Sequence, residues 1–279
     1  MHIEFGKIAS SEGSIPMYQG VSEMIAVTQH TEFGKRPIKV LDLGGGNGII
    51  GSLLKQQLEE SQGPLSENEF SSLIDYVNVD IDRKELAKSP GRKIHGNVVH
   101  LYDQLKTEPR FDFVLSVNWF KPIINVSTLY SSQQRRMAIE SSQDNIQTNI
   151  QRAILLSTAL LLWNGGKFVF SGFVDQETFD GIETYVDRQQ LGLVIEPGKR
   201  VELNEDAKNL FVQFDTGMEP SDENFSKIKQ FYPSYRQFTM RKDRIGGGRQ
   251  RLMELLKRAT ETHDQSLEFL QFEDRFGEW

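Results

Sequence analysis

The stretch Ile38–Gly51, IKVLDLGGGNGIIG, constrains the fold of this chain more than any other. It opens with a short apolar run that is typical of a buried strand. Four glycines follow at Gly44, Gly45, Gly46 and Gly48, and the residues after them repeat apolar side chains at helical spacing. A strand, a glycine turn and a helix in this order let the backbone approach a nucleotide closely, because glycine has no Cβ atom and the helix start offers free N–H groups. We therefore predict an α/β fold with a ligand at this turn.

Two cofactor interpretations fit the turn. Gly46–Gly51 matches the dinucleotide pattern G-x-G-x-x-G. Asp42–Gly48 matches D-x-G-x-G-x-G, which resembles the first motif of class I S-adenosylmethionine (SAM)-dependent methyltransferases. Asp42 favours the second interpretation, since a carboxylate at the strand end suits a cationic ligand group and opposes an anionic pyrophosphate. A glycine-rich turn that binds nothing is the third interpretation.

Two distant segments extend the resemblance. Phe111–Val117, FDFVLSV, is similar to the fourth motif of these methyltransferases, and Trp163–Gly172 is similar to the segment that ends their fourth helix and begins their fifth strand. The resemblance covers about Ile38–Asp215. It implies a doubly wound, mostly parallel seven-stranded Rossmann-like sheet with helices on both faces and an antiparallel last strand. Leu191–Glu196 and Leu210–Asp215 are the segments that we expect to supply the last two strands.

The resemblance also implies the residues that hold SAM. In chain order they are Asp42, Gly44, Gly45, Gly46, Asn47, Gly48, Asp80, Ile81, Asn97, Val98, Ser116 and Val117. The glycine backbone would cradle the amino-acid part of SAM, and Asp42 would help to hold its ammonium group directly or through water.

Three residues are expected at the adenosine half. Asp80 would accept hydrogen bonds from both ribose hydroxyls, and Ile81 would lie on the adenine. Asp82 is the alternative ribose ligand, although it can equally cap the helix that starts near Arg83. Asn97 stands where the family usually has an acid that contacts the adenine amino group. An amide oxygen can accept the same hydrogen bond.

Catalytic residues are harder to predict, because methyl transfer depends mainly on positioning and needs a general base only for acceptors that keep their proton. Asn118 and Trp119 follow the fourth strand and are candidates for the acceptor pocket, and His30 is the candidate base. Metal-dependent relatives place an acid at the exit of the fourth strand, where this chain has Val117 and Asn118. We therefore expect no metal.

The flanks of the central domain, residues 38–215, differ in character. Residues 1–37 are expected to form an N-terminal helical lid, with a helix over Pro16–His30. Residues 216–279 are expected to form a basic, largely helical extension. Within it, Ser234–Arg258 holds eight Lys and Arg against two acids. This stretch is either a solvated surface or, through Arg236–Arg258, a docking surface for an RNA or protein acceptor.

Composition narrows the function. The net charge of −7 argues against broad nucleic-acid affinity, so a small-molecule acceptor methylated on oxygen or nitrogen is the first expectation. The alternatives are an RNA or protein acceptor, an NAD(P)-dependent oxidoreductase and a non-catalytic scaffold. The chain has no cysteine, no apolar run of bilayer length and no secretory pattern at its start. We therefore expect a cytoplasmic protein without a membrane partner, and the oligomeric state stays open.

Overall fold

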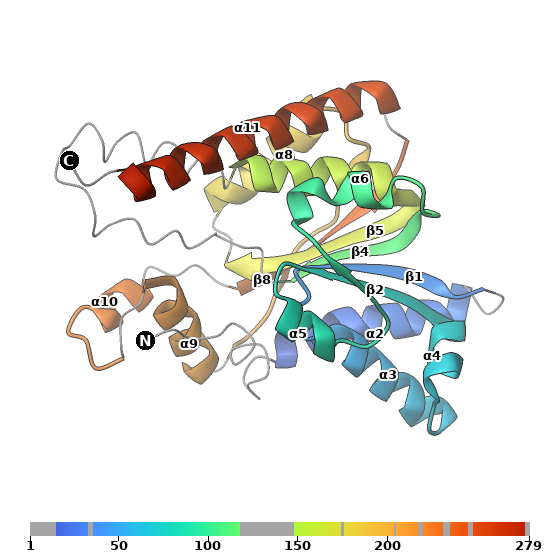
Figure 1. Ribbon diagram of the computed structural model, residues 1–279. Coiled ribbons are helices and arrows are strands. Elements are labelled where there is room, and N and C mark those ends of the chain that lie inside the picture. Colours follow the sequence, from blue (N-terminus) through green and yellow to red (C-terminus); the bar gives the residue numbers. More distant parts are fainter. Residues whose placement is uncertain are drawn as a thin grey trace.

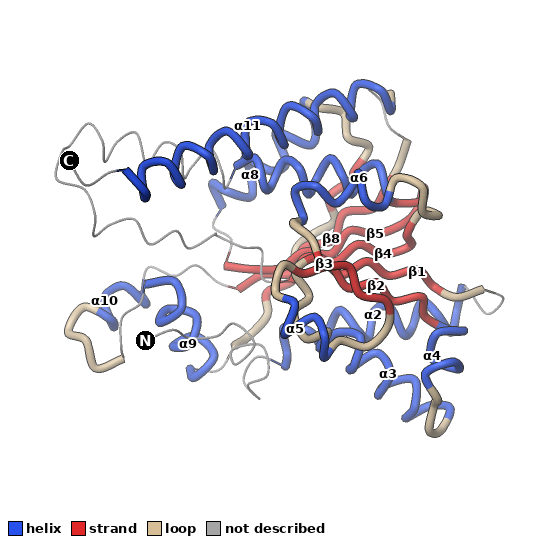
Figure 2. The backbone as a smooth tube through the Cα atoms, viewed as in Figure 1, coloured by secondary structure: helices blue, strands red, loops and turns tan. Residues whose placement is uncertain are grey.

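A β-sheet lies between two layers of helices in the computed structural model (Figures 1 and 2). The structure describes residues 15–32, 36–117, 148–173, 176–203, 205–216, 220–230, 235–244 and 248–276. In this part of the chain, no helix is both long enough and apolar enough to cross a membrane.

The strands lie in the order β3-β2-β1-β4-β5-β8-β6, and the short strand β7 pairs with β8 beside this path. Their bounds are β1 (Ile38–Leu43), β2 (Ile74–Asp80), β3 (Arg92–His95), β4 (Phe111–Val117), β5 (Leu162–Phe173), β6 (Leu193–Ile195), β7 (Lys199–Arg200) and β8 (Tyr235–Lys242). Neighbours from β3 to β5 are parallel, whereas β8 is antiparallel to both β5 and β6. The predicted fold class, with a reversed last strand, is confirmed.

The helices form one layer on each face of the sheet (Figure 1). One layer contains α2 (Ile15–Glu32), α3 (Ile49–Gln62) and α4 (Glu67–Leu73). The other contains α6 (Leu101–Leu105), a helix over residues 148–161, α8 (Gln176–Arg188) and α11 (Arg249–Phe276). The remaining short elements are α5 (Arg83–Lys88), η2 (Val98–His100), α9 (Glu205–Thr216) and α10 (Phe225–Gln230).

Each face of the sheet has its own apolar core. Successive side chains of a strand point to opposite faces, so Val40 packs with the α2–α3 layer while Leu41 packs with the layer of α8 and α11. Within the segment predicted to form a lid, Val21 and Ile25 of α2 are fully buried in the first of these cores.

The predicted position of the last strand is wrong. Residues 210–215 are part of α9, which begins with two acids, Glu205 and Asp206, as suits a helix start. The antiparallel strand is β8, and it lies in the segment that we predicted to be a helical extension. The charged residues of this segment made it resemble an exposed helix. In the structure Lys242 is nevertheless buried, and it donates a hydrogen bond of 2.9 Å to the Leu191 carbonyl. Burial lowers the pKa of Lys242 to about 8.

The junction before β5 also differs from the prediction. We expected the segment Trp163–Gly172 to end the preceding helix and begin the fifth strand, but that helix ends at residue 161 and β5 begins at Leu162. The pairing of β4 with β5 shifts between Phe111 and Phe113, and Gly165 has φ +86°. The glycines therefore form an irregular strand start that lets β5 pair with β4 immediately after the helix.

Candidate functional site

The glycine turn lies where β1, β2 and β3 end together at one edge of the sheet. The Gly44 N–H donates to the Val79 carbonyl over 2.8 Å, and the Gly96 N–H donates to the Asp80 carbonyl over 3.1 Å. The first bond ties the turn to the end of β2, and the second ties the loop after β3 to the end of the same strand. In an open parallel sheet, ligands bind at this carboxyl edge.

Alternate residues of β2 hold the turn from below. The Tyr76 hydroxyl donates to Asp42 Oδ2 over 2.5 Å. Asn78 Nδ2 donates to the Gly46 carbonyl over 2.9 Å, and the Gly46 N–H donates to Asp80 Oδ2 over 2.8 Å. The turn is therefore held by Tyr76, Asn78 and Asp80, three alternate residues whose side chains point to the same face of β2.

Tyr76 and Asn78 are not among the site residues predicted from the sequence. The signal that could have found them is their period of two, since they alternate with Val77 and Val79 along the strand. Polar groups at such buried positions are normally bonded to a specific partner.

The turn is tight underneath and open above. A Cβ atom on Gly45 would lie 2.5 Å from Asp42 Oδ2 and 2.6 Å from Asn78 Oδ1, so only glycine fits there. At Gly44 and Gly46 the φ angles are +67° and +52°, and a Cβ atom would meet nothing within 4 Å. A ligand therefore has access to the backbone on the open side, as a SAM cradle requires.

Asp42 lies under the turn rather than beside the open space. Its side chain is 1% exposed. Burial raises its pKa to about 7, the nearby Asp80 charge adds to the rise, and the Tyr76 hydrogen bond opposes it. We expected Asp42 to hold a ligand ammonium group either directly or through water. Its burial favours the indirect contact.

We predict that this carboxyl makes stability fall as pH rises. The folded form binds the Asp42 proton up to about pH 7, whereas the unfolded chain loses it near the ordinary value of 3.8. Stability is thus lost between these values, by about 4 kcal/mol at most. Chemical denaturation of Asp42→Asn at pH 5 and pH 8 should show a much smaller difference than wild type. Asn78 Oδ1, which is buried beside the same turn, has no hydrogen-bond partner among the residues that the structure describes. An equal pH dependence of stability in wild type and Asp42→Asn would show that the Asp42 pKa is not raised in the folded protein.

The two acids after β2 have different surroundings. Asp82 caps α5, because one of its carboxylate oxygens accepts from the Lys84 and Glu85 N–H groups. Asp80 accepts one backbone N–H at each oxygen, from Gly46 and from Asp82, so each oxygen keeps a lone pair for a further donor. Ile81 follows directly and is 70% exposed, which is unusual for a large apolar residue.

The loop after β3 brings Asn97 and Val98 to the same edge. Asn97 Oδ1 accepts from the Val99 N–H over 3.0 Å and caps η2. It retains one lone pair. Ser116 and Val117 end β4 and are almost fully buried. Asn118 and Trp119 lie outside the described residues, as does the side chain of His30, whose backbone is part of α2. Among the described residues, no three His, Cys, Asp or Glu are grouped as a metal site.

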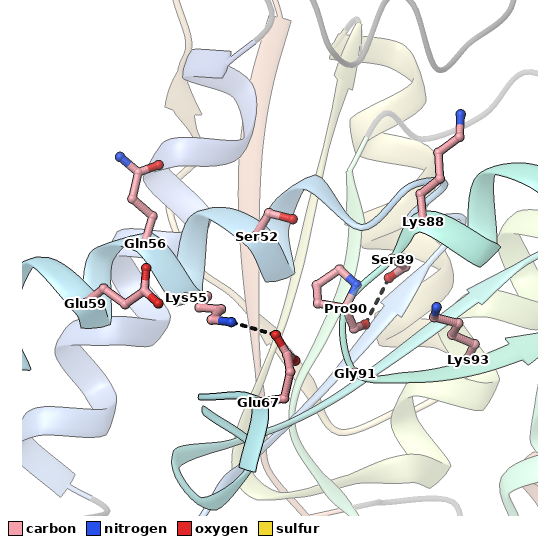
Figure 3. Close-up of a pocket in the computed structure, with 10 residues that line it drawn as sticks. All are labelled: Ser52, Lys55, Gln56, Glu59, Glu67, Lys88, Ser89, Pro90, Gly91 and Lys93. Atoms are coloured by element: carbon pink, nitrogen blue, oxygen red, sulfur yellow. Dashed lines mark hydrogen bonds and ion pairs between the residues drawn. The ribbon is translucent and has the colours of Figure 1, made fainter. Parts of the chain in front are cut away.

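A cavity of about 520 Å³ lies away from this edge, between α3, α4 and the start of β3 (Figure 3). Its three lysines are engaged: Lys55 pairs with Glu67, Lys88 pairs with Glu85, and Lys93 donates to the Ala87 carbonyl. None of the predicted cofactor-binding residues lines it. This cavity is therefore separate from the predicted cofactor site.

Comparison with known proteins gives similarity at the level of structure. Neither a family model nor a curated protein matches the chain. The chain is similar to the plantazolicin methyltransferase BpumL, solved in complex with S-adenosylhomocysteine (SAH), with 13% identity over 86% of this chain and 88% of that one and a TM-score of 0.47. It is also similar to the N-methyltransferase NodS from Bradyrhizobium japonicum WM9, solved with SAH, with 9% identity over 85% and 91% of the two chains and a TM-score of 0.45. At such identities the similarity concerns the fold, and the chemistry has to be argued from the residues described above.

Proposed function

We propose that this chain is a SAM-dependent methyltransferase. The observation that carries the proposal is the position of β8, which runs antiparallel between β5 and β6. In the classic dinucleotide-binding order, 3-2-1-4-5-6, the sixth strand lies directly beside the fifth, whereas the methyltransferases that this sequence resembles have a reversed last strand. The glycine turn alone fits both families, so the reversed strand is the feature that favours SAM over NAD(P).

The described residues fit the parts of SAM. The open backbone at Gly44 and Gly46 would take the amino-acid part, and Asp80 would accept the ribose hydroxyls with its remaining lone pairs. The exposed Ile81 side chain would lie against the adenine. Asn97 and the Val98 backbone would contact the adenine edge. Ser116 and Val117 would close the site at the end of β4.

Bound SAM would supply a methyl group activated by a positively charged sulfur. On transfer, the acceptor oxygen or nitrogen would bond to the methyl carbon as the S–CH₃ bond breaks, which would leave a neutral thioether, and the acceptor would release its proton to solvent. The role of the chain is to hold donor and acceptor in line, which by itself removes much of the barrier. We propose a small-molecule acceptor, since the net charge of −7 opposes polyanionic acceptors.

Calorimetric titration of the purified chain with SAM, SAH and NADH tests the cofactor. We expect binding of both adenosyl compounds, with a stoichiometry of one, and no heat from NADH. Binding of NADH alone would overturn the proposal in favour of an oxidoreductase. Binding of SAH with no methyl transfer to any acceptor pool would leave a non-catalytic scaffold instead.

A further inference from the structure

A larger cavity lies on the opposite face of the sheet from α2 and α3. Its volume is about 890 Å³, and it opens between the helix over residues 148–161, α8 and α11. In Figure 1 these helices form the layer above the sheet. Three arginines line it, Arg152, Arg188 and Arg258, and no described Asp or Glu side chain does. We refer to this cavity as the arginine groove.

The exposed arginines of the groove form no ion pair within the described part of the chain. Arg188 and Arg258 are exposed, and neither forms an ion pair with a described carboxylate. Arg152 lies over the Tyr185 ring, with its guanidinium carbon 5.5 Å from the ring centroid. A protein with a net charge of −7 that leaves three guanidinium groups around one cavity offers an anion a localised attractive field.

The floor of the arginine groove is apolar. Leu155, Ile182, Leu255 and Ala259 line it, and all of them belong to the apolar core of this face or pack against it. Neutral hydrogen-bonding residues, among them Thr184 and Gln189, also line the groove. The combination of an apolar floor with a few polar groups is that of a small-ligand site, and the volume is within the usual range of about 300–1,000 Å³.

We propose that the arginine groove binds a compact organic anion, with an apolar body that lies on the leucine floor and phosphate or carboxylate groups that face the arginines. Arginine suits both groups because its planar guanidinium can bond two oxygens at once. A compact ligand fits better than a polynucleotide, since a long polyanion would extend beyond the groove onto a surface that is acidic on balance. Of the predicted docking stretch Arg236–Arg258, only its last residues line the groove, so the site is assembled by the fold and not by a tail. None of the predicted cofactor-binding residues contributes to it.

The test uses 1-naphthyl phosphate and 1-naphthoate as probes, titrated into the full chain by calorimetry. We expect saturable binding of at least one probe at a single site, with the two probes distinguishing phosphate from carboxylate recognition.

The double variant Arg188→Gln/Arg258→Gln should weaken that binding by about tenfold or more per arginine. Arg244→Gln removes one charge from an exposed position outside the groove and should leave it unchanged. SAH affinity, measured in parallel, reports that each variant is folded and is expected to stay constant; circular dichroism gives the same information if SAH does not bind.

Three outcomes would overturn the proposal. The first is no saturable binding of either probe up to about 1 mM. The second is binding with equal affinity in wild type and the double variant, which would place the probes elsewhere. The third is displacement of the probe by a short single-stranded RNA that binds more tightly and loses affinity in the double variant, which would make the groove a nucleic-acid site.

Discussion

Replacing Asp80 by alanine is expected to weaken SAH binding by about 2–3 kcal/mol, or about 30- to 150-fold. The carboxylate would lose its hydrogen bonds to the ribose hydroxyls. It would also lose its bond to the Gly46 N–H, which holds the glycine turn against β2. Both losses act at the ligand site, so isothermal titration with SAH should show the full effect while the midpoint of thermal unfolding changes little.

Asp82→Ala is the matched control for this prediction. It removes an acid two residues away, but that acid caps α5 through the N–H groups of Lys84 and Glu85. We expect a loss of about 1 kcal/mol in stability and little change in SAH affinity. If Asp82→Ala weakens SAH and Asp80→Ala does not, the ribose ligand is Asp82 and our assignment is wrong.

The parts of this fold that could be predicted from sequence are those with local signals. The β1 strand, its glycine turn and α3 are contiguous, and each element has its own pattern of apolar spacing. The reversed last strand could be predicted only through the resemblance to a family, because pairing of β5 with β8 joins residues far apart in the chain.

The position of β8 could not be predicted, for a physical reason. Its sequence YRQFTMRK reads as a charged surface segment, yet Phe238 and Met240 are buried and Lys242 satisfies its ammonium group on the Leu191 carbonyl. A strand with a partner on each side can bury a lysine only when a specific hydrogen-bond acceptor for its ammonium group is present. Nothing in the local sequence reports that acceptor.

The candidate site shows the same division. Asp42 and the glycines were predicted from their motif, whereas Tyr76 and Asn78 were not, because they act through contacts with another strand. The motif covers the backbone that we propose to face the ligand, and the side chains beneath that backbone come from β2. Sequence motifs of this kind therefore identify the surface of a site more readily than its support.

The largest loss of stability is expected from Gly45→Ala, and the comparison with Gly44→Ala shows why. At Gly45 the added methyl group would lie 2.5 Å from Asp42 Oδ2 and 2.6 Å from Asn78 Oδ1. Both atoms belong to buried side chains that are hydrogen-bonded to the surrounding structure, so neither can move away cheaply. We expect a loss of about 3 kcal/mol, the upper end for overpacking, in urea denaturation.

Gly44→Ala separates this clash from backbone strain. Its methyl group would meet nothing within 4 Å, but the φ of +67° costs an alanine about 1–2 kcal/mol. The free energy of unfolding should therefore fall less than in Gly45→Ala. The affinity for SAH should nevertheless fall, because the methyl group enters the open space that we assign to the ligand. Gly181→Ala, at an exposed helical position of α8 with nothing within 4 Å, should instead add up to about 1 kcal/mol. If Gly44→Ala leaves SAH affinity at the wild-type value, the ligand does not lie over this side of the turn, and the proposed orientation of SAM is wrong even if SAM binds.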